Sequence, residues 1–217
     1  KEIRYQLQRL KGFACIILWC GNNEIASGWL NWGWKEKLPN SVWEDYNKLF
    51  HDLLPYLCDE VDPDRLYWPT SPGHSTKSPN QDQIYGSGDT HYWGVWHGGD
   101  DFSQFENNVG RFMSEYGMQS FPGLVTIESF TNKQDRRLES DVMNAHQKAS
   151  LGTGNLMKYI EVYYRSNDDF ESLVLLSQVM QGQAIKSAVE SHRRNMPYCM
   201  GTLYWQLNDC WPVISWS

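Results

Sequence analysis

Two glutamates stand directly after predicted strands, where the side chains of an active site are often placed. Glu24 follows the apolar run that ends at Cys20, and Glu115 lies at the end of a predicted strand that begins at Arg111. In barrel enzymes the catalytic residues lie at the carboxyl ends of the strands. Two carboxyl groups that face one another there can cleave a glycosidic bond. One protonates the leaving oxygen, and the other attacks the anomeric carbon or activates water.

A single glutamate after a strand is more often a helix cap or an ion-pair partner. The residues beside the two glutamates therefore decide whether a catalytic role is favoured. Asn22 and Asn23 precede Glu24 and offer amide groups that can bind a sugar hydroxyl and orient an acid. Aromatic side chains at 91–93 and 204–205 are expected around the same strand ends. Their faces can pack against the C–H groups of a sugar ring. Together these residues favour a pair of catalytic carboxyl groups.

The elements that must position these side chains alternate between strand and helix. Strands are predicted at 14–20, 65–68, 91–96, 111–116 and 200–207. Helices are predicted at 2–10, after a capping box at 41–44, and at 101–109, 134–149, 155–165 and 170–194. The first strand lacks polar alternation, which predicts that it is buried on both faces. Strands separated by helices indicate right-handed crossovers and a parallel sheet.

The predicted fold class is α/β, of the (β/α)8 or TIM-barrel type, present as a partial barrel. A complete barrel usually takes about 250 residues, and this chain has 217 residues for five predicted strands. An open doubly wound sheet could also use five strands. However, the glycine-rich phosphate turn that follows the first strand of such a sheet is absent here.

Composition excludes several other classes of protein. The formal net charge of −7 argues against sequence-independent binding of nucleic acid, which needs a basic face. No apolar run approaches the length of a membrane span. No histidine and cysteine spacing typical of a zinc site occurs, so neither a metal nor a cofactor is expected. The aromatic share of 14% indicates a stacking surface or a piece of a larger protein.

Three motifs resemble β-mannosidases of glycoside hydrolase family 2, and together they span nearly the whole chain. They are LWCGNNE at 18–24, SEYGMQSFP at 114–122 and GTLYWQLNDCWP at 201–212, and GDTHYW at 88–93 fits between them. The resemblance implies that Glu24 is the acid/base and Glu115 is the nucleophile. It also implies hydrolysis of β-mannosides with retention of configuration, through a covalent mannosyl-enzyme.

The same resemblance implies roles for five further residues. Asn23 is similar to the family's ligand for the sugar 2-hydroxyl, and Trp205 is similar to the aromatic platform beneath the bound sugar. Trp32 is expected to line the pocket. His91 and Tyr92 are expected near the nucleophile, because members of this clan place a tyrosine or histidine on the sixth strand.

The resemblance also implies that the five strands are the fourth to the eighth of a barrel. Residues 1–217 are then a fragment of the catalytic barrel, and strands one to three and the preceding β-sandwich domains lie outside it. The expected partners are β-mannoside oligosaccharides or glycan fragments and the missing N-terminal domains of the parent chain. Without those domains, the fragment is expected to be inactive or nearly so.

Two other functions remain open from the sequence. Another family 2 activity, such as β-galactosidase, β-glucuronidase or exo-glucosaminidase, would use the same two carboxyl groups in a different pocket. A non-catalytic carbohydrate-binding module would use only the aromatic rings. Substitution of Glu24 and Glu115 separates the two classes, because a binding module needs no carboxyl group at either strand end.

Overall fold

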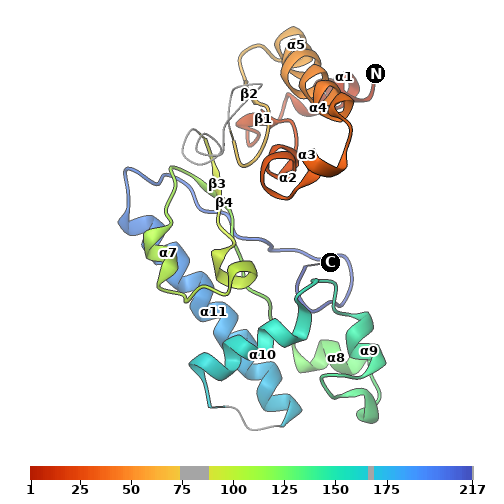
Figure 1. The fold of residues 1–217 in the computed structure, drawn as a ribbon, viewed down its shortest axis with the longest axis vertical. Helices are drawn as coiled ribbons and strands as arrows, with labels where there is room; N and C mark the ends of the chain where they lie inside the picture. Colours follow the sequence, from red (N-terminus) through yellow and green to blue (C-terminus); the bar gives the residue numbers. More distant parts are fainter. Residues whose placement is uncertain (74–87, 166–168, 217) are drawn as a thin grey trace. The chain divides into compact units, whose positions relative to one another are not determined.

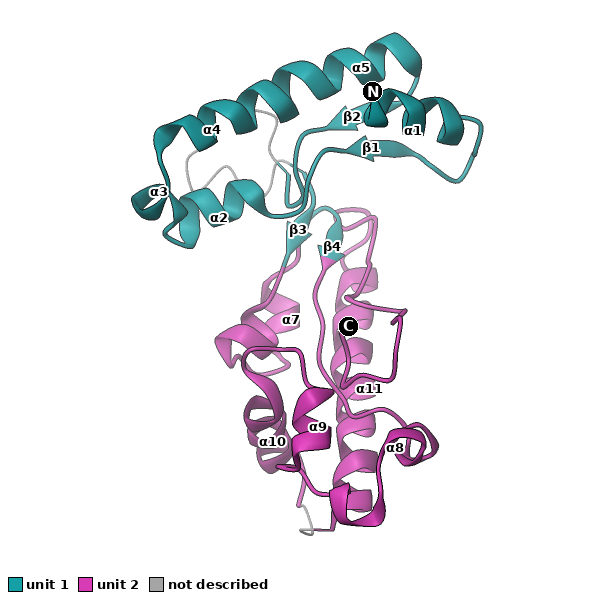
Figure 2. Cartoon of the chain, turned by 90° about the vertical axis from the view of Figure 1, so that its right-hand side faces the viewer, with its two compact units in different colours: residues 1–91, 110–114 teal, residues 92–109, 115–217 magenta. Residues whose placement is uncertain are grey.

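The computed structural model describes residues 1–73, 88–165 and 169–216 (Figure 1). The chain forms two compact units, which Figure 2 shows in different colours. The first unit is Lys1–His91 with Gly110–Ser114, and the second is Tyr92–Val109 with Glu115–Ser217.

The first unit contains a pair of short strands beside a group of helices. Its helices are α1 (Glu2–Leu10), α2 (Ile25–Asn31), α3 (Trp34–Lys37), α4 (Asn40–Asn47) and α5 (Leu54–Val61), with a π-helical segment, Lys48–Leu53, between the last two. Its paired strands are β1 (Leu18–Cys20) and β2 (Leu66–Trp68). They are parallel, and Leu18 lies opposite Leu66. The predicted parallel pairing of the first two strands is therefore confirmed.

Helices α1 and α5 pack against each other and against one face of this strand pair. Leu7 from α1 and Leu57 and Cys58 from α5 are buried together. Trp19 in β1 and Tyr67 in β2 pack against this cluster. The middle residues of both strands therefore point toward the helices, and their neighbours point away from them.

The prediction that the first strand is buried on both faces is wrong for this chain. The strand covers three residues, and Ile17 and Leu18 are 74% and 38% exposed. On the partner strand, Leu66 is 62% exposed. The apolar run has the composition of a strand covered on both sides, but within the described residues helices cover only the face that carries Trp19.

The capping box predicted at 41–44 is also not formed. Helix α4 begins at Asn40, with Pro39 as its N-cap residue and no side-chain capping bond. Ser41 therefore lies inside the first turn and not at the cap. Pro39 has φ −66° and ψ 148°, the extended conformation usual for an N-cap residue, and the helix begins at the next residue.

The second unit is mainly helical. Its helices are α7 (Gln104–Asn107), α8 (Leu124–Phe130), α9 (Asp141–Ala145), α10 (Gly152–Tyr163) and α11 (Phe170–Arg194), with a 3-10 turn at Lys133–Asp135. The pattern at 170–194 predicted α11 correctly, and Asp169 caps it by accepting a bond from the backbone N–H of Ser172. Helix α8 follows the 111–116 strand and was not predicted from the sequence.

Helix α11 is the central element of the second unit and packs against α10 and α7. Met180, Ala184 and Ala188 of α11 are fully buried. The hydroxyl of Ser191 donates to the carbonyl of Phe105 in α7, at 3.0 Å. Despite its 25 residues, neither α11 nor any other helix in the described ranges is long and apolar enough to cross a membrane.

Strands β3 (Thr90–His91) and β4 (Met113–Glu115) form a second two-stranded sheet, through which the division between the units passes. The backbone N–H of Thr90 donates to Phe112, and that of Tyr92 donates to Glu115, at 2.8 and 2.9 Å. The acceptor of Tyr92 lies further along the chain than the acceptor of Thr90, so the two strands run in the same direction and are parallel.

One predicted strand ends five residues earlier than expected, and another is absent. The strand expected at 91–96 ends at His91, because the backbone leaves the extended region at Trp93 (φ −115°, ψ 15°) and enters a π-helical segment at Gly94–Gly98. The strand expected at 200–207 is not formed, and its Leu203 and Leu207 are 56% and 86% exposed. The described residues thus contain two separate two-stranded sheets and not one wall of five strands.

Candidate active site

Glu24 lies between β1 and α2 in a backbone conformation that is unusual for a side chain of its size. Its φ is 60°, in the left-handed region, and it occupies the N-cap position of α2. Its N–H donates to the carbonyl of Ser71 at 2.7 Å, and its carbonyl accepts from Gly28 at 2.8 Å. Non-glycine residues at positive φ are rare and are found where the surrounding structure holds them.

The neighbouring Asn22 supplies much of this restraint. Its side-chain oxygen accepts bonds from the hydroxyl of Thr70 and the N–H of Ile25, at 2.9 and 3.2 Å. Its amide nitrogen donates to the carbonyl of Pro69 at 2.9 Å. Asn22 thereby joins the start of α2 to the segment after β2, and Glu24 is fixed between them. In this structure the amide of Asn22 has a structural role.

The left-handed backbone leads to a stability prediction for Glu24. Glu24→Gly and Glu24→Ala both remove the side chain, but only glycine adopts a φ of 60° without steric cost. The glycine variant should therefore be more stable to urea unfolding than the alanine variant by about 1 kcal/mol. Equal stability of the two variants would mean that the backbone of Glu24 is not strained.

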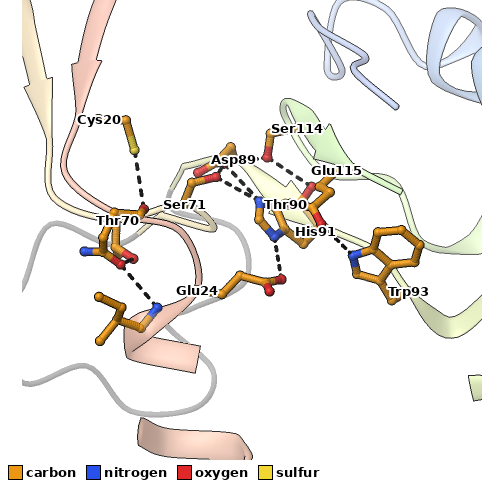
Figure 3. A network of polar contacts seen from close by, with 12 residues as sticks. Cys20, Glu24, Thr70, Ser71, Asp89, Thr90, His91, Trp93, Ser114 and Glu115 are labelled. Carbon is orange, nitrogen blue, oxygen red and sulfur yellow. Dashed lines mark hydrogen bonds and ion pairs between the residues drawn. The ribbon is translucent and has the colours of Figure 1, made fainter. Parts of the chain in front are cut away.

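The carboxyl group of Glu24 is in direct contact with a buried imidazole. Its Oε1 lies 2.7 Å from Nδ1 of His91, and the two side chains are 21% and 4% exposed (Figure 3). The other ring nitrogen, Nε2, lies 2.8 Å from the hydroxyl oxygen of Ser71. Both nitrogens of His91 are therefore occupied, and its ring is fixed in orientation. Glu24 keeps partial access to solvent, as a group that transfers a proton to a ligand requires.

Asp89 completes this group of polar side chains. Its Oδ2 accepts hydrogen bonds from the hydroxyls of Ser71 and Ser114 (Figure 3). The same oxygen lies 3.9 Å from Nε2 of His91. Asp89 and both serines belong to the first unit, together with Glu24 and His91. The result is a continuous chain of polar contacts from Asp89 through Ser71 and His91 to Glu24.

Glu115, at the end of β4, belongs to the second unit. Its carboxylate Oε1 accepts a hydrogen bond of 3.2 Å from the indole N–H of Trp93 (Figure 3). The next residue, Tyr116, is fully buried, and its carbonyl accepts a bond of 2.7 Å from the N–H of Trp205. The segment that contains Trp205 therefore lies beside the end of β4, although it forms no strand.

Trp205 and Tyr92 both belong to the second unit, as Glu115 does. The Trp205 side chain is free to contact a ligand, whereas the Tyr92 hydroxyl is already hydrogen-bonded. The carbonyl of Trp205 lies 2.4 Å from where a Cβ on Gly117 would be, so glycine permits the close approach. The Trp205 side chain remains exposed, as a sugar platform would require. The hydroxyl of Tyr92 donates to Asp100 at 2.7 Å, and burial together with this bond raises its pKa.

Asn23 and Trp32 lie at opposite ends of α2 in the first unit. Asn23 is exposed, and its backbone bridges to Ser71 in parallel register. Trp32 is 49% exposed and packs edge-on against Trp34, with ring centroids 5.7 Å apart. Both side chains are accessible to a ligand, and their proposed roles in binding remain predictions.

A buried histidine stabilises the segment beside Glu115. His192 in α11 is 1% exposed, and its Nδ1 lies 2.8 Å from the hydroxyl of Thr202. That hydroxyl also contacts the phenol of Tyr116 at 2.7 Å. Burial lowers the pKa of His192 to about 4, so the neutral ring is the form that fits.

His192 should make folding sensitive to acid. Its pKa is about 4 in the folded protein against 6.5 without burial, so the unfolded chain binds the proton first. The neutral ring contributes fully to the free energy of unfolding above pH 6.5, and this contribution is lost as the pH falls from 6.5 toward 4. Urea unfolding at several pH values should show a loss of about 3 kcal/mol across that window. His192→Asn, which does not titrate, should lack this component; an unchanged slope would contradict it.

Three residues of the site were not identified as functional from the sequence: Ser71, Asp89 and Ser114. Trp93 was expected as a stacking ring, and its hydrogen bond to Glu115 was not. Asp89 and Trp93 lie within the GDTHYW motif, and Ser114 precedes Glu115 within a second motif. Ser71 could have been suspected, because it follows β2 at the same end as Glu24 follows β1. No sequence signal indicates that the hydroxyls of both serines meet at Asp89, or that Ser71 also contacts His91.

Strand-end carboxyl groups with accessible aromatic rings are typical of glycoside hydrolases. Comparison with known proteins agrees with this class. The chain is 35% identical over its whole length to β-mannosidase B of Aspergillus clavatus and of Emericella nidulans, and 34% identical to that of Aspergillus niger. The crystal structure of a β-D-mannosidase from Dictyoglomus thermophilum matches the whole chain with a TM-score of 0.87 and 38% identity. No family model matches the chain.

The chain is therefore similar, from end to end, to one segment of the β-mannosidases, and the resemblance to β-mannosidases inferred from its motifs is confirmed. It spans about 27% of the length of these curated relatives and 26% of the matched crystal structure. The described sheets do not form a barrel wall by themselves.

Proposed function

We propose that this chain is part of the catalytic domain of a retaining exo-β-mannosidase of glycoside hydrolase family 2. The observation that carries the proposal is the similarity of the whole chain to β-mannosidases. The contact of 2.7 Å between Glu24 and the buried His91 supports it further, because it places a proton-exchanging partner next to the proposed acid. The partner molecule would be a β-mannoside oligosaccharide or glycan fragment.

In this mechanism Glu24 is the acid/base and Glu115 is the nucleophile. The carboxylate of Glu115 forms a bond to the anomeric carbon as the glycosidic C–O bond breaks, and Glu24 transfers its proton to the leaving oxygen. Glu24, now a carboxylate, then removes a proton from water while the water oxygen displaces Glu115. Two displacements restore the original configuration. Both reacting groups are side chains, so the mechanism requires no metal or cofactor.

Accessible side chains near the two glutamates are assigned to substrate binding. Asn23 would bind the 2-hydroxyl, and its exposure beside Glu24 is consistent with this role. Trp205 would provide the platform for the sugar, and Trp32 would line the pocket. Tyr92 would act through its backbone bond to Glu115, since its hydroxyl is engaged by Asp100. The bond from Trp93 would hold the carboxylate of Glu115 in position.

We further propose that the chain supplies strands four to eight of a barrel in a longer protein. The exposed Ile17, Leu18 and Leu66 support this, because a two-stranded sheet leaves uncovered the apolar side chains that a barrel would bury. Upstream strands and β-sandwich domains would complete the sheet and the pocket. The 217-residue chain without them is expected to show no appreciable hydrolysis.

The test is a panel of nitrophenyl glycosides offered to the full-length protein that contains this chain. The proposal predicts the highest kcat/KM on the β-mannoside. Faster turnover of a β-galactoside, β-glucuronide or β-glucosaminide would reject mannose in favour of another family 2 activity. Binding of mannosides without any turnover would identify a carbohydrate-binding module.

A further inference from the structure

The contact between Glu24 and His91 belongs to a longer chain of polar contacts that restricts where protons can lie (Figure 3). Oε1 of Glu24 lies 2.7 Å from Nδ1 of His91, and Nε2 of His91 lies 2.8 Å from the hydroxyl oxygen of Ser71. That hydroxyl in turn contacts Asp89. The side chain of His91 is only 4% exposed, so bulk water cannot replace these partners.

Asp89 acts in this chain as an acceptor. One of its oxygens receives the hydroxyls of Ser71 and Ser114. Its other oxygen is buried without a partner among the described residues, and the same is true of the indole nitrogen of Trp68. Oδ1 of Asp89 lies 2.8 Å, and Nε1 of Trp68 lies 1.7 Å, from the point where a Cβ on Gly73 would be. The two atoms are therefore close neighbours. An indole N–H can only donate. The two hydroxyls and the indole N–H that lie near the Asp89 carboxylate in the described residues are thus all able to donate to it.

The position of the remaining protons follows from this. Ser71 has a single hydroxyl proton, and it is directed at Asp89. The oxygen of Ser71 must then accept from His91, which places a proton on Nε2. Nδ1 of His91 and Oε1 of Glu24 are 2.7 Å apart and cannot both present lone pairs. One proton is therefore shared between them.

We propose that Ser71 and Asp89 are positioning residues that keep a proton on Nε2 of His91 and thereby keep one proton between Nδ1 and Glu24. The role of this proton rests on the proposed function, in which Glu24 gives it to the glycosidic oxygen as the C–O bond breaks. With the opposite tautomer, Nδ1–H would donate to a Glu24 carboxylate that has no proton to give. A wrong histidine tautomer is costly in the same way in serine proteases.

Other ionisable groups near this chain define the background of its pH dependence. Cys20 lies close enough to Asp89 that desolvation and this negative charge raise the pKa of its thiol. Glu115 follows Ser114 along β4. Substitutions at Ser71 and Asp89 address the histidine tautomer most directly, because Ser71 contacts Nε2 of His91 and Asp89 accepts the hydroxyl proton of Ser71.

The test compares two variants of the full-length protein. Each removes, in a different way, the hydrogen-bond acceptor that keeps a proton on Nε2 of His91. Ser71→Ala removes the oxygen that accepts from Nε2. Asp89→Asn introduces an amide that can donate to Ser71, whose hydroxyl proton then turns toward Nε2. Both should move the basic limb of the kcat/KM profile to lower pH by about one unit. Both should lower kcat/KM about tenfold or more on an alkyl mannoside and at most about twofold on a dinitrophenyl mannoside, which needs no acid.

Two further variants serve as controls. Ser71→Thr keeps the hydroxyl and should retain the profile of the unaltered protein. Ser41→Ala removes an exposed serine of α4 in the same unit and should change nothing. Folded Ser71→Ala and Asp89→Asn variants with an unmoved basic limb, or with equal losses on both substrates, would overturn the proposal.

Neutron diffraction of the unaltered full-length protein decides the same question without any substitution. Deuterium on Nε2 of His91 at alkaline pH supports the proposal, and deuterium only on Nδ1 overturns it, whatever the activity. If Nε2 carries deuterium but the protein hydrolyses no β-mannoside, the proton arrangement stands and the proposed function fails.

Discussion

Glu115→Gln in the full-length protein should lower kcat on β-mannosides by about four orders of magnitude or more, because an amide cannot replace a carboxylate that attacks carbon. The substitution is isosteric, and its side-chain oxygen can still accept the 3.2 Å bond from Trp93. Loss of activity would therefore report on the missing nucleophile and not on a changed fold. The measurement is steady-state hydrolysis of a nitrophenyl mannoside.

A matched control lies in the same unit. Glu128 in α8 is an exposed glutamate that pairs with Arg136 at 2.9 Å, away from the strand ends. Glu128→Gln should retain the full rate. If Glu115→Gln also retained within about tenfold of the original activity, Glu115 would not be a covalent nucleophile.

Glu24→Gln should give a different signature, because the acid/base acts in both displacements. On substrates with poor leaving groups, kcat/KM should fall by about 10²–10⁴-fold. On a dinitrophenyl mannoside, the first displacement should be nearly normal, and the glycosyl-enzyme should accumulate because no base activates water. Added azide should restore turnover and yield a β-mannosyl azide, since azide attacks without losing a proton.

The control for Glu24→Gln is Glu44→Gln, an exposed glutamate in α4 of the same unit. It should leave the rates on both leaving groups unchanged and show no response to azide. An equal loss on every substrate by Glu24→Gln, without azide rescue, would identify Glu24 as a structural residue. The proposed pairing of acid and nucleophile would then be wrong.

The candidate residues could be found from the sequence because strand ends and motifs mark them locally. Glu24 follows β1 and Glu115 ends β4, as the apolar runs predicted. The partners of Glu24 could not be found in this way. His91 lies 67 residues further along the chain, and its contact with Glu24 arises only when β3 is placed near the loop after β2. Ser71 is likewise defined by tertiary contacts.

Two predictions about strands were wrong for physical reasons. The apolar segment at 200–207 has the composition of a strand, but it contacts the end of β4 only through single residues, such as the backbone bond from Trp205 to Tyr116, and forms no ladder. The run before β1 was interpreted as buried on both faces, yet Ile17 remains exposed because only the Trp19 face is covered. In both cases the sequence pattern reflects an environment with more partners than these sheets provide.

The central claim is tested most directly by trapping the covalent intermediate. The full-length protein would be treated with a fluorinated mannosyl donor that carries a dinitrophenyl leaving group, digested, and analysed by mass spectrometry. The fluorine slows release of the sugar more than its attachment, so the ester should survive. The account predicts one modified peptide with the sugar on Glu115. A sugar attached to any other residue, or turnover with inverted configuration and no adduct, would contradict it.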